Sequence, residues 1–109
     1  MLRERWAESA RADLLRMQAF WTDAQPARLP DVFAAINARI LWLCQGNYLL
    51  GTQFTGLSPA YRSIVERRYG YRIYYRIEGD PPNTIAIIAI RHGRQRPVAG
   101  EALRRTAEA

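Results

Sequence analysis

The chain has 109 residues, a length that favours a single domain, and 49% of them are hydrophobic, as expected of a globular protein with a real core. The net charge is +6 and all sixteen basic residues are arginines, which suit phosphate or carboxylate partners, although a GC-rich genome would also explain the absence of lysine. One cysteine and one histidine exclude an internal disulfide and a structural zinc site of the usual ligand set, and no metal or other cofactor is expected.

The sequence pattern predicts neither a targeting segment nor a membrane span. The N-terminal stretch MLRERWAES lacks the apolar core of a signal peptide, and no stretch approaches the ~18 apolar residues of a span. Cys44 falls in an apolar helical pattern, so we interpret it as a small buried hydrophobic residue rather than a nucleophile paired with His92. A cytoplasmic protein without a membrane partner is therefore expected.

Two amphipathic helices are predicted after a short edge strand at residues 2–6. Ser9 is a candidate cap for a first helix over residues 9–24, and Asp13 falls in its first turn, where the helix dipole favours negative charge. The second helix ends at Gly46, and the short proline-containing connection indicates an antiparallel helical hairpin. The apolar positions at helical spacing are Ala10, Leu14, Met17 and Trp21 in the first helix and Phe33, Ile36, Ile40 and Leu43 in the second.

Residues 46–61 are predicted to form a loop, because they contain three glycines, one proline and several small polar residues. We expect Tyr48, Leu50 and Phe54 to attach this loop to the core, as is common in long ordered loops.

From residue 61 onward the pattern changes to the period of two that is typical of strands, which are predicted over residues 61–68, 71–78 and 84–92. The middle strand divides into a core face, with Tyr71, Ile73, Tyr75 and Ile77, and a polar face, with Arg72, Tyr74, Arg76 and Glu78. The last strand, TIAIIAIRH, is apolar on both faces and is predicted to lie at the centre of the sheet.

Together these elements predict an α+β fold, in which an N-terminal helical hairpin packs on a small three- to four-stranded antiparallel sheet. We assign residues 1–97 to this single domain. Residues 98–109 are assigned to a polar C-terminal tail that is either a short helix or disordered.

The hairpin of the last two strands should bring basic residues together at one end of the sheet. The end of the last strand lies beside the start of its partner, so Arg91 and His92 should neighbour Tyr71 and Arg72. Like charges this close repel each other, so the cluster either receives an anionic partner or forms a solvated sheet edge that prevents aggregation. The predicted target-binding site comprises Arg67, Arg68, Arg72, Arg91, His92, Arg94 and Arg96, with Tyr71 and Tyr74 nearby.

Paired carboxylates for acid–base catalysis are not evident in the sequence. We interpret Glu66, beside Arg67 and Arg68, as an ion-pair partner. By itself His92 is more often a hydrogen-bonded structural residue than a catalyst.

Four segments, in order and spacing, resemble the RelE/ParE superfamily, the toxins of bacterial type II toxin–antitoxin modules. They are RWAESARADLLRM, with its Ala10, Asp13 and Leu14 element, then YRSIV, YRIYYRI and IAIIAIRHGRQ. The resemblance extends from the N-terminus to about Pro97. It implies a helical hairpin packed on a small antiparallel sheet, in agreement with the periodicity.

The resemblance also implies a partner. A small, largely acidic antitoxin would wrap a flexible segment around the toxin and neutralise it in a hetero-oligomer, and it would typically carry a DNA-binding part as well. A chain with net charge +6 and a basic sheet end is electrostatically suited to such a partner.

Two actions occur in the superfamily, so whether this chain is an enzyme stays open. ParE-like members bind DNA gyrase and trap its cleaved complex without being nucleases, and the RHGRQRP ending and the helical hairpin favour this action. RelE-like members cut mRNA on the ribosome, with Arg72, His92 and Arg94 as the catalytic candidates here. That alternative lacks a C-terminal aromatic acid or base, since no tyrosine follows Tyr75.

A third hypothesis is a non-catalytic nucleic-acid-binding module. Basic charge with interleaved tyrosines would suit single-stranded RNA. The spacing of the tyrosines and tryptophans argues against it, because it is that of helix and sheet cores.

Overall fold

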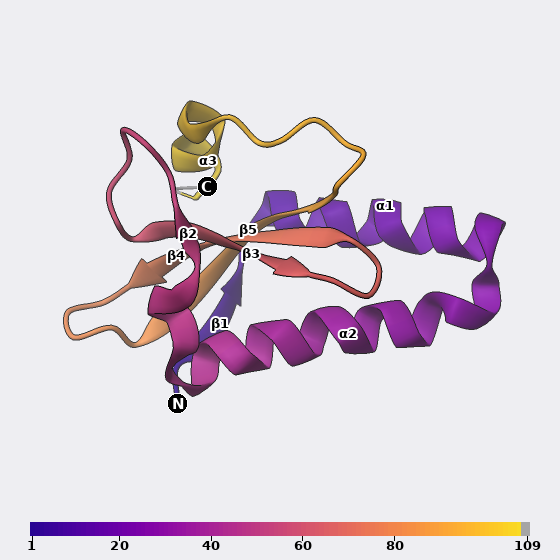
Figure 1. Cartoon of the computed structure of the whole chain (residues 1–109), viewed down its shortest axis with the longest axis horizontal. Coiled ribbons are helices and arrows are strands. Elements are labelled where there is room, and N and C mark those ends of the chain that lie inside the picture. Colours follow the sequence, from indigo (N-terminus) through magenta and orange to yellow (C-terminus); the bar gives the residue numbers. More distant parts are fainter. Residues whose placement is uncertain (108–109) are drawn as a thin grey trace.

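The computed structural model describes residues 1–107 and has an α+β fold, in which a helical hairpin lies against a five-stranded sheet (Figure 1). The helices are α1 (Glu8–Ala24), α2 (Leu29–Trp42) and α3 (Gly100–Ala107), with the short helical turns η1 (Pro26–Arg28), η2 (Leu43–Asn47) and η3 (Tyr48–Leu50). The strands are β1 (Arg3–Trp6), β2 (Thr52–Gln53), β3 (Tyr61–Glu66), β4 (Tyr71–Glu78) and β5 (Thr84–His92). Within the described part, no helix has the length and apolar character needed to cross a membrane.

The predicted helical hairpin is confirmed, with α1 and α2 joined by the proline-containing turn η1 (Figure 1). The prediction that Ser9 caps α1 is wrong. The helix begins after Ala7, and the Ser9 hydroxyl instead donates a hydrogen bond to the backbone carbonyl of Ile88 at 2.5 Å. Helical backbone continues from α2 into η2 and stops at Gly46, whose φ of 113° is left-handed backbone that favours glycine, so the predicted stop is confirmed.

The sheet has five strands rather than three to four, in the order β1-β5-β4-β3-β2. Strands β4 and β5 have the predicted bounds, and β5 lies in the interior of the sheet as predicted. Strand β1 pairs with β5 in parallel, so the sheet is mixed, and the two-residue β2 forms within the predicted loop and pairs with β3. A parallel partner needs a long crossover connection, which local periodicity does not reveal.

The main core lies between the helical hairpin and one face of the sheet. The predicted core face of β4 is confirmed, because Tyr71, Ile73 and Tyr75 are buried there. Cys44 is also buried in this core, and burial raises the pKa of its thiol, which confirms its interpretation as a small hydrophobic residue. Other fully buried side chains of this core are Ile36, Ile40, Leu43, Ile85 and Ile87.

The other face of the sheet is also covered, although the sequence pattern predicts an exposed polar face there. Helix α3 places the fully buried Leu103 in a second apolar cluster with Tyr61 and Tyr74. The ring of Phe54 stacks on that of Tyr74, with the centroids 5.8 Å apart. Tyr74 is therefore buried, because the chain after β5 returns over this face.

Polar contacts hold the segment between α2 and β3. The hydroxyl of Tyr75 donates to the carbonyl of Tyr48 at 2.5 Å, and burial raises the pKa of this phenol to about 12. Leu50 is 69% exposed and does not attach the segment as expected. The buried guanidinium of Arg62 donates to the backbone carbonyls of Leu49, Gly51 and Pro59 at 2.8, 3.2 and 2.8 Å.

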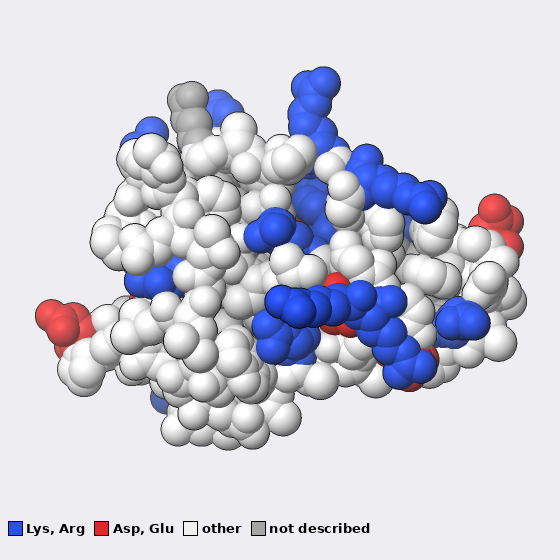
Figure 2. Space-filling model, in the orientation of Figure 1, with Lys and Arg blue, Asp and Glu red and all other residues white. Residues whose placement is uncertain are grey.

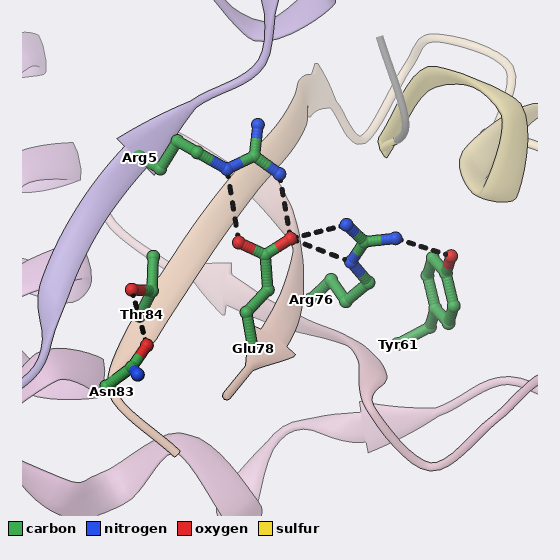
Figure 3. Close-up of polar contacts among 6 residues, drawn as sticks. All are labelled: Arg5, Tyr61, Arg76, Glu78, Asn83 and Thr84. Atoms are coloured by element: carbon green, nitrogen blue, oxygen red, sulfur yellow. Dashed lines mark hydrogen bonds and ion pairs between the residues drawn. The ribbon is translucent and has the colours of Figure 1, made fainter. Parts of the chain in front are cut away.

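A network of charged side chains ties β1, β4 and β3 together across this second face (Figure 3). Glu78 accepts hydrogen bonds from Arg5 at 3.1 and 2.8 Å and from Arg76, which also donates to Tyr61 at 3.2 Å. Arg5 and Arg76 are both register partners of Ala86, so the two arginines flank it on the same face of the sheet. The hydrogen bonds from Arg5 hold the pKa of the Glu78 carboxyl below its ordinary value near 4.5.

Replacing Glu78 by glutamine should lower the free energy of unfolding by about 2 kcal/mol at pH 7, because two arginines lose their carboxylate partner. Since the folded-state pKa of Glu78 is lowered, this contribution is complete above about pH 4.5 and disappears as pH falls through the folded-state pKa. Urea unfolding of wild type and Glu78→Gln at pH 7 and near pH 3 measures both effects.

A matched control is Asp23→Asn, which removes an exposed carboxylate of α1 and should change stability by less than ~0.5 kcal/mol. A stability difference between wild type and Glu78→Gln that stays constant down to about pH 3 would contradict the role given to the ionised carboxylate.

Candidate functional site

The start of β4 and the end of β5 lie side by side at one end of the sheet. Tyr71 is the register partner of His92 and Arg72 that of Arg91, as the antiparallel hairpin predicts. The amide of Gly93 donates to the carbonyl of Gly70 at 2.9 Å, so the β3–β4 turn adjoins the chain after β5. We call this end, which contains all the predicted site residues, the basic end. It carries Arg67, Arg68, Arg72, Arg91, His92, Arg94 and Arg96.

The two register pairs point to opposite faces of the sheet, because successive side chains of a strand alternate. Tyr71 and His92 lie on the face of the helical hairpin, where their rings meet edge to face with centroids 5.3 Å apart. Arg72 lies on the other face and donates to the hydroxyl of Ser63 at 2.9 Å. The residues proposed from the sequence as a catalytic set are thus divided, with Arg72 and His92 separated by the sheet.

Asp13 of α1 organises the end of β5. One of its oxygens accepts the backbone amide of Ile90 at 2.9 Å, and the other contacts the guanidinium of Arg91 at 3.2 Å and that of Arg16. Its side chain is only 2% exposed, so these partners compensate the loss of water around a buried charge. The sequence places Asp13 between Ala10 and Met17 on the apolar stripe of α1, and a carboxylate in that position is the signal of a buried role.

The β3–β4 turn is fixed by two acidic residues. The buried Glu66 carboxylate accepts the backbone amides of Arg68 and Tyr69 at 2.6 and 3.0 Å, a role different from the predicted side-chain ion pair. Arg68 pairs with Asp31 of α2 at 3.0 Å, and the Tyr69 hydroxyl donates to the same carboxylate. That hydrogen bond raises the pKa of Tyr69 and joins the turn to the start of α2.

Four arginines of the basic end have no acidic partner within the described residues, and one of them, Arg72, is half-buried and hydrogen-bonded to the hydroxyl of Ser63. The other three are Arg67, Arg94 and Arg96, and all three are exposed. Figure 2 shows basic side chains gathered in a band across the part of the molecule where β3 turns into β4 and the chain leaves β5. Unlike Arg68, Arg72 and Arg91, these three are available to an anionic partner.

His92 shapes the turn that follows β5. Its Nδ1 accepts the backbone amide of Arg94 at 3.2 Å, and its own amide donates to the side-chain oxygen of Gln95 at 2.6 Å. These contacts agree with the interpretation of His92 as a hydrogen-bonded structural histidine. They also direct the chain so that Arg94 lies beside the hairpin face of the sheet.

A groove with a cavity volume of about 490 Å³ opens between α1 and the basic end. We call it the aromatic groove. Its apolar lining comprises Met17, Phe20, Trp21, Tyr69, Tyr71 and Ile90. Its polar lining comprises Asp13, Arg16, His92, Arg94 and Gln95.

The walls of the aromatic groove are joined by polar and ring contacts. The indole N–H of Trp21 donates to the hydroxyl of Tyr71 at 2.8 Å, and burial raises the pKa of Tyr71, so the phenol is protonated near pH 7. The sequence analysis missed this groove, because its lining comes from α1, the β3–β4 turn and the end of β5. Nothing in the described part gathers three or more His, Cys, Asp or Glu side chains in a way that would hold a metal ion.

Comparisons with known proteins agree with this geometry. A family model described as "ParE toxin of type II toxin-antitoxin system, parDE" matches residues 5–97. A search of curated proteins finds no match. Among solved structures, the chain is similar to one from P. aeruginosa, titled "Chromosomal ParDE TA system from P. aeruginosa", with a TM-score of 0.66 and 20% identity over 84% of this chain and 96% of that one.

Replacing Asp13 by asparagine should lower the free energy of unfolding by about 3 kcal/mol. A neutral amide removes the ion pair with Arg91 and weakens the hydrogen bond from the backbone amide of Ile90. The backbone amide of Ile90 should also exchange faster with solvent. Chemical denaturation and hydrogen exchange measure the two effects. Arg16→Gln is the matched control, and since Arg16 is 61% exposed it should cost less than about 1 kcal/mol. Equal losses in the two variants would contradict the central role of Asp13.

Proposed function

The chain belongs to the family of ParE toxins of type II toxin–antitoxin systems, and on this premise we propose that it inhibits DNA gyrase until an acidic antitoxin neutralises it. Membership of this family implies an antitoxin partner. The matched residues, 5–97, contain the helical hairpin, strands β2 to β5 and the basic end. The proposal places the toxin in the cytoplasm with gyrase and, when neutralised, in a hetero-oligomer with the antitoxin.

The observation that carries the proposal is the trio of exposed arginines at the basic end. Within the described residues Arg67, Arg94 and Arg96 have no acidic partner, and they belong to the β3–β4 turn and to the chain after β5, two segments that the hydrogen bond from Gly93 to Gly70 brings together. Their mutual repulsion is relieved by an anionic surface, which also accelerates association. We assign these three arginines to target contact, whereas Arg68, Arg72 and Arg91 serve the fold.

Two features support a binding toxin over a ribosome-dependent nuclease. The three catalytic candidates do not converge on one reacting group, because Arg72 lies on the face of the sheet opposite His92 and only Arg94 lines the aromatic groove with His92. The Nδ1 of His92 is also engaged by a backbone amide of its own turn.

A nucleic-acid-binding module would need aromatic faces exposed on the sheet for base stacking. The tyrosines of β3 and β4 do not provide them, since Tyr61, Tyr71, Tyr74 and Tyr75 are all buried. This arrangement favours recognition of a folded partner over recognition of a nucleic acid strand.

The test is a supercoiling assay with purified protein, DNA gyrase and relaxed plasmid. We expect loss of supercoiling and accumulation of cleaved DNA, and expression in bacteria without the antitoxin should arrest growth. Unchanged gyrase activity together with mRNA cleavage on ribosomes would refute the proposal in favour of the nuclease.

The variant Arg67→Gln/Arg94→Gln/Arg96→Gln should weaken gyrase inhibition by at least about tenfold, because it removes the three unpaired charges. The matched control is Arg3→Gln/Arg104→Gln/Arg105→Gln, which removes three exposed arginines elsewhere and lowers the net charge equally. The control should inhibit gyrase within about twofold of wild type. Equal losses in both variants would show that net charge matters and that the basic end does not.

A further inference from the structure

Aromatic rings in edge-to-face contact line the aromatic groove. Trp21 meets Phe20 and Tyr69 edge to face, with ring centroids 5.4 and 5.6 Å apart and interplanar angles of 87° and 78°. Tyr71 meets His92 in the same way, at 82°. These rings are packed against one another around the cavity, whereas nucleobase binding uses parallel stacking on an open ring face.

The opening of the aromatic groove combines exposed apolar surface with positive charge. Phe20 is 59% exposed, although a side chain of this size is usually buried. Arg16 and Arg94 line the same cavity, and both are exposed. A ligand complementary to this opening therefore carries an apolar group together with carboxylates.

We propose that the aromatic groove anchors the antitoxin, by taking one bulky apolar side chain from an acidic segment whose flanking carboxylates pair with Arg94 and Arg16. The inference rests on the proposed function, in which an acidic antitoxin neutralises the chain. The cavity volume of about 490 Å³ lies within the range of roughly 300–1,000 Å³ of ligand pockets, so it accommodates a large side chain with part of its backbone. A buried apolar anchor surrounded by charged contacts is the usual arrangement of a binding hot spot.

Charge complementarity favours this occupant over a segment of DNA. Phosphates would match Arg16 and Arg94 but would leave Phe20 and the apolar floor at Met17 and Ile90 without a partner. A carboxylate-rich peptide with an apolar side chain satisfies both parts. Because Arg94 belongs to the groove and to the basic end, an antitoxin seated here would remove one of the three target-binding charges.

The experiment titrates three acetylated hexapeptides, EELFEE, EEGSEE and QQLFQQ, into isotopically labelled full-length protein and follows binding by NMR. The peptide EELFEE should shift the indole N–H signal of Trp21 and the backbone amide signal of Arg94. The backbone amide signals of Leu15 and Arg104 should not shift. The peptides without the apolar pair or without the charges should each bind about tenfold more weakly, since each lacks one half of the match. Equal binding of EEGSEE would overturn the inference, because charge alone would then explain it.

Two pairs of variants locate the site. Phe20→Ala and Arg94→Gln should each weaken EELFEE binding by about tenfold. Their matched controls are Leu15→Ala, which truncates another exposed apolar residue of α1, and Arg104→Gln, and both should stay within about twofold of wild type. Unchanged binding in Phe20→Ala and Arg94→Gln would overturn the proposal, and so would displacement of the peptide by a single-stranded DNA oligonucleotide that perturbs the same signals.

The supercoiling assay on the same protein separates the two proposals. Inhibition of gyrase without specific binding of EELFEE overturns the groove assignment and leaves the toxin function standing. Specific peptide binding without any effect on gyrase supports the groove and refutes gyrase as the target.

Discussion

The capping of the β5 edge by α1 is the contact from which the other features of the site follow. Strand β1 pairs with β5 only as far as Ile87, so β5 would otherwise end as an open edge beside the helical hairpin. Ser9 and Asp13, one helical turn apart, bind the carbonyl of Ile88 and the amide of Ile90 and continue the pairing with side chains. Helix α1 is thereby held along the strand, and the aromatic groove is the space that remains between them.

The basic character of the chain serves two separate purposes. Several arginines are bound within the fold, since Arg62 holds the β2 segment, Arg91 supports the buried Asp13 and Arg68 ties a turn to α2. A guanidinium suits these roles because it carries several donors in a fixed plane. Only part of the net charge of +6 is therefore available to a partner. The arginines that make no ion pair within the fold are the ones that indicate where a partner binds.

The parts of the fold that local patterns determine could be predicted from the sequence, as the bounds of β4 and β5 show. Side chains that serve distant backbone groups could not, and Ser9 and Asp13 are examples, because helical rules describe them as a cap and a dipole contact. The same reason hides the second apolar cluster, in which Leu103 of α3 covers Tyr74. For the site, pairing in the last hairpin predicted which basic residues are neighbours, but it did not reveal which of them the fold already neutralises.

The position of Arg94 couples the two proposed binding events physically. It lies in the turn shaped by His92 and lines the aromatic groove, and the exposed Arg96 follows two residues later in the chain. Exposed charges on neighbouring segments contribute to one electrostatic field, which draws any acidic partner to this end of the molecule. An antitoxin with an apolar anchor gains surface burial that a purely charged contact lacks, and desolvation strengthens its ion pairs once water leaves the groove. In the proposed arrangement, neutralisation prevails over target binding because the antitoxin adds apolar burial at the same end, and no change in the fold is required.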